Sequence, residues 1–161
     1  MDQFDAWIEF TKEIYADLAS KQMPSDNVRV QLFNTTIRVV EDDTYTALPY
    51  SKDHSPEETK EPKFKGKMFA FVLYYRILRN TASAEYLKTF HDRFVQATLK
   101  CHGTFYLCYL HHYSQKEILQ AYPMLPQFVK SKEKWDPQGL FDSEWFRQYC
   151  LPHASEGYRK Q

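Results

Sequence analysis

The sequence predicts an α+β fold in which an antiparallel sheet carries helices on one of its faces. Two kinds of pattern lead to this class: amphipathic stripes typical of surface helices, and short runs of aromatic and β-branched residues typical of strands. Along the chain they give the order helix, strand, loop, strand, helix, strand and then short helices. Because no internal repeat, low-complexity tract or second core is visible, we expect one domain over residues 1–161.

The first half of the chain supplies a helix, a strand and a loop. Apolar residues recur at three-and-four spacing through residues 3–20, which predicts an amphipathic helix stopped by Pro24. The β-branched run from 28 to 40 predicts a long strand, bulged near Asn34. Residues 44–66 hold three of the eight prolines and no periodicity, so we expect a partly mobile loop there.

The middle of the chain alternates strand and helix. The aromatic run 67–78 predicts a central strand, and Thr81 can cap a helix that runs through Lys100. Gly103, which accepts a left-handed backbone, is expected to end that helix. Bulky side chains alternate from 104 to 110, which predicts a third strand.

The last third contains the clearest local signals. Ser114 and Glu117 form a capping-box pattern, so a helix should start there and end before Pro123. The tetrapeptide 136–139, Asp-Pro-Gln-Gly, suits a type I turn. Asp142 or Ser143 can then cap a closing helix, whose apolar members are Trp145, Phe146 and Tyr149.

Composition excludes several classes of function. Basic and acidic residues are equal in number, so no net field steers the chain to nucleic acid or to an anionic membrane. No apolar run could span a bilayer and the start lacks the features of a signal peptide, so a cytoplasmic location without a membrane is expected. Three cysteines without C-x-x-C spacing (Cys101, Cys108 and Cys150) indicate buried reduced thiols and neither disulfides nor zinc.

One ordered set of motifs in the last third resembles a known family. The set comprises Gly103, Tyr106-Leu107-x-Tyr109, the capped helix ending in Ala121-Tyr122-Pro123, Phe128, Lys132, Asp136-Pro137-x-Gly139-x-Phe141 and Trp145. It resembles the C-terminal end of the FAD-linked oxidases, the superfamily of vanillyl-alcohol, berberine-bridge-type and sugar-lactone oxidases. Upstream, residues 38–43 and Leu48-Pro49-Tyr50 resemble that family's cap strand and the loop after it. The resemblance covers roughly residues 26 to 150.

The resemblance implies a cap domain on the substrate side of a flavin, with the closing helix packed on an FAD-binding domain or subunit. In the sugar oxidases of the family, the motif H-W-G-K occupies the positions held here by Tyr106, Leu107, Cys108 and Tyr109. The cationic lysine of that motif is therefore absent, and aldonolactone chemistry is not expected.

Tyr106, Tyr109 and His111 are the candidate catalytic residues. Phenol and imidazole groups can donate to a substrate hydroxyl or accept a proton from it. Arg38 could bind a substrate carboxylate in bidentate fashion, and Tyr50 and Tyr74 are assigned to substrate binding with it. The alternative for each is a structural role, with packed rings or an exposed strand cation.

A metal site is not expected at His111 and His112. Adjacent residues on a strand point to opposite faces, and no third ligand is suitably spaced. The chain also has only four glycines and no Gly-rich turn that would let backbone amides approach the pyrophosphate of FAD. The main FAD site is therefore expected in another domain or subunit.

Two explanations of this missing half stay open. The chain is either the C-terminal substrate-binding portion of an FAD-dependent oxidoreductase that oxidises a hydroxyl-bearing small molecule, inactive alone, or a non-enzymatic ligand- or protein-binding module derived from such a cap. We prefer the first, because Trp145, Phe146 and Tyr149 give the closing helix apolar surface suited to a partner.

Overall fold

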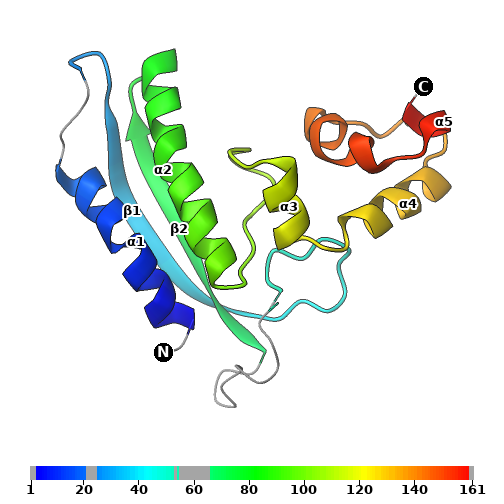
Figure 1. Cartoon of the computed structure of the whole chain (residues 1–161), viewed down its shortest axis with the longest axis horizontal. Coiled ribbons are helices and arrows are strands. Elements are labelled where there is room, and N and C mark those ends of the chain that lie inside the picture. Colours follow the sequence, from blue (N-terminus) through cyan, green and yellow to red (C-terminus); the bar gives the residue numbers. More distant parts are fainter. Residues whose placement is uncertain (1–2, 21–24, 53, 55–65, 160–161) are drawn as a thin grey trace.

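The chain forms an α+β structure with a two-stranded antiparallel sheet, seen in a computed structural model that describes residues 3–20, 25–52, 54 and 66–159. Figure 1 shows α1, α2 and the sheet as one group, and the remaining helices as a second group further along the molecule's longest axis. The elements in chain order are α1 (Gln3–Ser20), β1 (Val30–Glu41), β2 (Lys67–Ile77), α2 (Thr81–Lys100), α3 (Gln115–Ala121), α4 (Leu125–Trp135), η3 (Phe146–Cys150), η4 (Leu151–His153) and α5 (Glu156–Arg159).

β1 and β2 pair along nearly their whole length. The register runs from Val30 opposite Ile77 to Glu41 opposite Lys67, and it shifts between Leu32 and Asn34. The predicted strands 28–40 and 67–78 and the predicted bulge near Asn34 are therefore confirmed. Within the described residues the sheet has no third strand, so β2 is not central and the predicted strand at 104–110 is wrong.

α1 and α2 cover one face of the sheet and bury a first cluster of side chains, here called the helix–sheet core. The Trp7 ring stacks on Phe71 with ring centroids 3.8 Å apart, and its Nε1 donates to Thr98 Oγ1 at 3.2 Å. Val30 is fully buried beneath the helices. The cluster consists of Trp7, Ile14, Leu18, Val30, Leu87, Phe90, Phe94, Ala97 and Cys101. The stripe read from residues 3–20 is thus the buried face of α1.

A second cluster, the C-terminal core, lies on another side of α2. Val95 and Leu99 pack there against α3, α4 and η3, and Ile118, Leu125 and Val129 are fully buried. Phe94 belongs to the helix–sheet core, and the next residue, Val95, belongs to the C-terminal core. Successive residues of a helix point about 100° apart, so α2 can bury side chains on two sides. The sequence predicted a single core, whereas α2 joins two.

The ends of α2 differ from the prediction by one residue each. Asn80, not Thr81, caps the helix and accepts from the Ser83 amide at 2.8 Å. After the helix, His102 takes the left-handed backbone with φ 55°, although Gly103 was expected there. Gly103 is needed for space: a Cβ at this position would lie 2.9 Å from Thr98 Cγ2 and 3.2 Å from the Thr98 carbonyl oxygen.

The local signals of the last third are confirmed. Ser114 and Glu117 make both hydrogen bonds of a capping box, and α3 ends before Pro123. Gly139 N donates to Asp136 O at 3.1 Å in the predicted turn. Ser143 Oγ accepts from Phe146 N at 3.1 Å, so Ser143 caps the closing helix.

The apolar face of that closing helix is covered by the chain itself. Phe146 is 6% exposed and Tyr149 is 1% exposed, both in the C-terminal core, and Trp145 Nε1 donates to Tyr113 Oη at 2.8 Å. The expectation that this helix presents a free apolar surface to a partner is therefore wrong for Phe146 and Tyr149, and Trp145 is partly buried. The sequence did not show that Phe146 and Tyr149 pack against the apolar side chains of α3 and α4.

The predicted mobile loop, 44–66, falls partly outside the described residues, which omit 53 and 55–65. Its first part is held in place. Asp43 N donates to Ser51 O at 2.8 Å, and Ser51 is buried.

Candidate functional site

The segment between α2 and α3 carries the candidate catalytic residues, and it is irregular. It does not join the sheet, and Phe105 and Leu107 pack on the C-terminal core instead. Tyr106 and Tyr109 contact each other with ring centroids 4.8 Å apart. Residues three apart on a strand would point to opposite faces, so this contact depends on the turn.

Three tyrosines form an exposed aromatic cluster, here called the tyrosine cluster. Tyr50, from the loop after β1, lies edge-on to Tyr106 at 5.6 Å, and Tyr106 lies edge-on to Tyr109. Their exposed fractions are 47%, 46% and 73%. Thr104 Oγ1 donates to the Tyr50 carbonyl oxygen, which ties the two segments together. The structure thus brings together three of the six predicted site residues.

Tyr106 is suited to donate a hydrogen bond. Its interaction with the Cys108 thiol and the nearby ionisable groups raises the pKa of Tyr106 above its ordinary value. The phenol therefore stays protonated at neutral pH and cannot act as a base there. Cys108 itself is exposed, so its predicted burial is wrong, whereas Cys101 and Cys150 are buried as expected.

His111 lies beside the tyrosine cluster in sequence but makes separate contacts. Its Nε2 lies 3.0 Å from the Leu107 carbonyl oxygen. A carbonyl can only accept, so Nε2 carries the hydrogen and Nδ1 of the neutral ring is an acceptor. Among the described residues, no hydrogen bond or ring contact joins His111 to Tyr106 or Tyr109.

Arg38 and Tyr74 lie elsewhere, on the sheet. Arg38 pairs with Ala70 and Tyr74 pairs with Asn34, so both point away from the face that α1 and α2 cover. Four residues of β1 separate these positions, which is about 13 Å at the usual strand rise. In the described part of the chain, no hydrogen bond, ion pair or ring contact links either residue to the tyrosine cluster.

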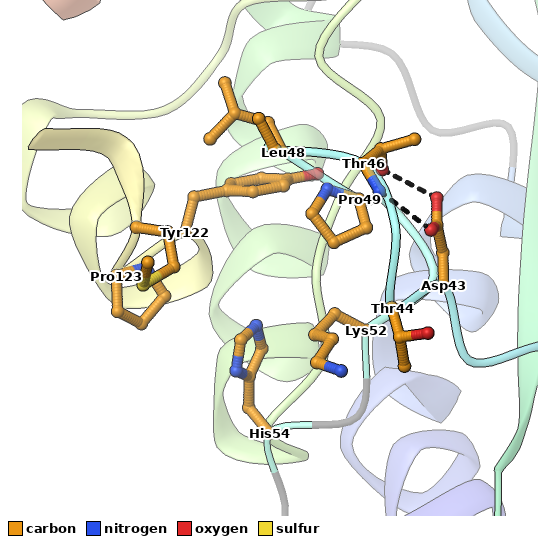
Figure 2. A pocket seen from close by; sticks show the side chains of 11 residues that line it. Asp43, Thr44, Thr46, Leu48, Pro49, Lys52, His54, Tyr122 and Pro123 are labelled. Atoms are coloured by element: carbon orange, nitrogen blue, oxygen red, sulfur yellow. Dashed lines mark hydrogen bonds between the residues drawn. The ribbon is translucent and has the colours of Figure 1, made fainter. Parts of the chain in front are cut away.

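A pocket lies next to the tyrosine cluster, between the loop after β1 and the α3–α4 junction (Figure 2). We call it the Tyr122 pocket. Its volume is about 250 Å³, and its lining residues are Asp43, Thr44, Thr46, Ala47, Leu48, Pro49, Lys52, His54, Tyr122, Pro123 and Met124. Figure 2 shows the Tyr122 ring between Leu48 and Pro49, with Lys52 and His54 on another wall.

The polar groups of this pocket are mostly engaged. The Asp43 carboxylate accepts from the Tyr45 amide, the Thr46 amide and the Thr46 hydroxyl, at 2.9, 3.1 and 2.6 Å. These bonds, that of the Thr46 side chain foremost, lower the pKa of Asp43. Lys52 Nζ donates to Asp42 Oδ2 at 3.1 Å. The Tyr122 hydroxyl donates to the Phe105 carbonyl oxygen, so only its ring faces the pocket as an apolar wall.

Sequence reasoning missed the Tyr122 pocket. Pro49 was placed in the predicted loop 44–66 and Pro123 at the end of a helix, and nothing in the sequence showed that they line one pocket. A usable signal was present in Asp43 and Thr46, because an aspartate that bonds the following amides fixes a tight turn. That turn indicates a structured loop where a mobile one was expected.

The residues do not fit a complete FAD site. The four glycines lie far apart in sequence, so they form no Gly-rich turn whose backbone amides could together approach a pyrophosphate. No group of three or more metal-ligating side chains gathers anywhere in the described residues. Over the same residues, we find no helix with the length and apolar character needed to traverse a bilayer.

Comparisons of the chain with protein-family models, with curated proteins and with solved structures each gave no match.

Proposed function

We propose that this chain is the C-terminal substrate-binding portion of an FAD-dependent oxidoreductase, and that the enzyme oxidises a hydroxyl-bearing small molecule. One observation supports the proposal. Leu48-Pro49-Tyr50 and Tyr122-Pro123, two separate segments that resemble the FAD-linked oxidases, line or adjoin one pocket beside the tyrosine cluster. In this proposal the sheet has the cap-like role, and a separate domain or subunit holds FAD.

The proposal gives each side chain a role that its contacts allow. Tyr106 and Tyr109 donate hydrogen bonds to the substrate, since both are exposed and Tyr106 keeps its proton. His111 offers Nδ1 as an acceptor for the substrate hydroxyl. Tyr50 supplies a ring surface. Arg38 and Tyr74 receive no role, because they lie apart on the sheet. The three free cysteines support a cytoplasmic location.

Phenylalanine variants of the native flavin-containing enzyme test these roles. In Tyr106→Phe and Tyr109→Phe, we expect kcat/KM to fall about tenfold each, the cost of one hydrogen bond to the substrate. Tyr45→Phe is the matched control, because Tyr45 is 96% exposed on the loop that also carries Tyr50. Unchanged turnover in both variants would contradict the assignment.

One observation favours the second candidate, a non-enzymatic ligand- or protein-binding module. The closing helix buries Phe146, Tyr149 and Cys150 in the chain's own C-terminal core, so that helix has no need of a flavin-binding partner. If native protein retains small-molecule binding but contains no flavin and no flavin-binding subunit, this second function replaces the first.

A further inference from the structure

We propose that the tyrosine cluster, Tyr50, Tyr106 and Tyr109, binds a trimethylammonium group through the faces of its rings. The proposed function assigns the hydroxyl groups of Tyr106 and Tyr109 to a substrate, whereas this inference concerns the ring faces and requires no flavin. The ligand is defined by one feature, a methylated cation without N–H groups, either free in solution or part of a lipid headgroup.

The rings of the cluster form two corners. The planes of Tyr50 and Tyr106 stand at 88° with centroids 5.6 Å apart, and those of Tyr106 and Tyr109 stand at 64° with centroids 4.8 Å apart. Where two rings meet edge to face, one face of each ring borders a shared corner. A cation in such a corner can reach both faces within the roughly 6 Å over which a ring attracts a cation. All three side chains are exposed, so a ligand has access to them.

The backbone around the central ring is held in place before any ligand binds. The hydroxyl of Tyr122, a side chain only 2% exposed, donates to the Phe105 carbonyl oxygen. On the other side of Tyr106, His111 Nε2 donates to the Leu107 carbonyl oxygen at 3.0 Å. Because both neighbours of Tyr106 are fixed in this way, binding requires little further ordering of the chain.

The chemistry of the cluster favours a cation without N–H groups. The face of a neutral phenol ring is the negative side of its quadrupole. Within the described part of the chain, the groups that act on the Tyr106 phenol are Cys108, Tyr109 and Tyr50, with no carboxylate or ammonium group among them. A primary ammonium would give up hydrogen bonds to water without gaining a carboxylate acceptor, whereas a trimethylammonium group has no such bonds to lose.

Three probes with the same hydroxyethyl group test the class of ligand: choline, its neutral isostere 3,3-dimethylbutan-1-ol, and ethanolamine. Each is titrated into the uniformly ¹⁵N-labelled 161-residue chain at neutral pH and constant ionic strength, and amide shifts are followed by NMR. We expect choline to shift the amides of residues 50 and 104–110 with a Kd on the order of 5 mM, as for two or three exposed cation–π contacts. The isostere and ethanolamine should bind at least about fivefold more weakly.

Substitutions separate the ring faces from the hydroxyl groups. Tyr106→Leu removes the ring shared by both corners, so choline affinity should fall at least about fivefold. Tyr106→Phe keeps the ring and loses only the hydroxyl, so choline affinity should stay within about twofold. Tyr109→Leu, at a more exposed position, should also lower the affinity and serves if Tyr106→Leu does not fold. Tyr45→Leu is the matched control, since Tyr45 is 96% exposed on the loop that carries Tyr50.

Sedimentation with phosphatidylcholine vesicles distinguishes the two sources of the group. If choline binds and the chain stays in the supernatant, the ligand is a free cation. If the chain pellets with the vesicles and choline releases it, the ligand is a lipid headgroup.

Each result decides the inference. Choline binding ahead of both other probes, with loss in Tyr106→Leu and retention in Tyr106→Phe, supports it. Equal binding of the isostere overturns recognition of the charge, and equal binding of ethanolamine overturns recognition of the methyl groups. Absence of binding, or choline shifts that persist in both leucine variants, overturns the site. An equal loss in Tyr106→Phe and Tyr106→Leu overturns the role of the ring face.

The proposed function and this inference fail separately. Under the proposed function, Tyr106→Phe lowers the turnover of the native flavin-containing enzyme. Under this inference, the same variant keeps choline bound to the 161-residue chain.

Discussion

Acid should destabilise this protein through a half-buried pair of histidines that lies between α2 and the segment before α3. His91 of α2 meets His112 of the segment before α3 edge to face, with ring centroids 5.1 Å apart, and Tyr75 of β2 lies 5.8 Å from His91. The Tyr75 hydroxyl and His112 Nδ1 are buried and have no hydrogen-bond partner among the described residues. Asp92 favours a positive charge on His112, and Lys88 and His111 oppose it.

The size of the effect follows from one pKa. Burial, with a smaller contribution from His112, lowers the pKa of His91 from 6.5 to about 4. The pKa of His91 is lower in the folded chain than in the unfolded chain. The free energy of unfolding therefore keeps its full value above pH 6.5 and decreases as the pH falls toward about 4. At about 1.4 kcal/mol per pKa unit the full loss is about 3 kcal/mol, of which about 2 kcal/mol has occurred at pH 5.

Urea unfolding at pH 7.5 and pH 5 measures this loss. Carboxylates also titrate in this range, so the informative quantity is the free energy of unfolding of His91→Phe minus that of the unmodified chain. Phenylalanine keeps a ring in the cluster, and the difference should rise by about 2 kcal/mol from pH 7.5 to pH 5. His153→Gln, outside the cluster, should show no such rise. A difference that stays constant with pH refutes the reasoning.

Three further substitutions probe single contacts through the urea midpoint. Gly103→Ala should cost about 1–3 kcal/mol because its Cβ overlaps Thr98, and adding Thr98→Ser, which removes the nearest atom, should restore part of this. Ser114→Ala should cost about 1 kcal/mol through loss of the capping box. Tyr149→Phe should cost about 1 kcal/mol, because its hydroxyl lies 3.2 Å from the His111 and 3.1 Å from the Tyr113 carbonyl oxygen.

Each of these has its own contrary result. A stable Gly103→Ala variant would mean that the backbone near Thr98 yields easily. Equal midpoints for Ser114→Ala and Lys116→Ala, an exposed neighbour in α3, would mean that the cap adds nothing. A neutral Tyr149→Phe would mean that water replaces the hydroxyl at those two carbonyls.

Local features were predictable because their causes are local. The Ser114–Glu117 box, the turn at 136–139 and the stripe of α1 depend on residues a few positions apart, and all three are present.

Features that depend on distant partners were not predictable. Residues 104–110 have a strand pattern, yet this segment stays outside the sheet, and Phe105 and Leu107 pack on the C-terminal core. The closing helix was read as a free surface because the burial of Phe146 and Tyr149 requires α3 and α4 to fold against it.

The candidate site shows the same division. Tyr106 and Tyr109 were grouped with His111 by residue type, and a turn in place of the predicted strand brings the two tyrosine rings together. Tyr50 joins them across more than fifty residues, and the Tyr122 pocket forms between segments that sequence alone could not place side by side. Arg38 and Tyr74 were grouped with the site by residue type, but the strand register places both on the sheet, apart from the tyrosine cluster.

The central claim is that this chain works as the substrate side of a flavin enzyme, and purification from the native source tests it directly. An antibody against residues 136–150 recovers the protein, and its size and visible absorbance spectrum are then read together. We predict a flavin spectrum, on a polypeptide longer than 19.3 kDa or in a complex with a flavin-binding subunit. A 19.3 kDa protein purified with neither flavin nor such a subunit would contradict the account.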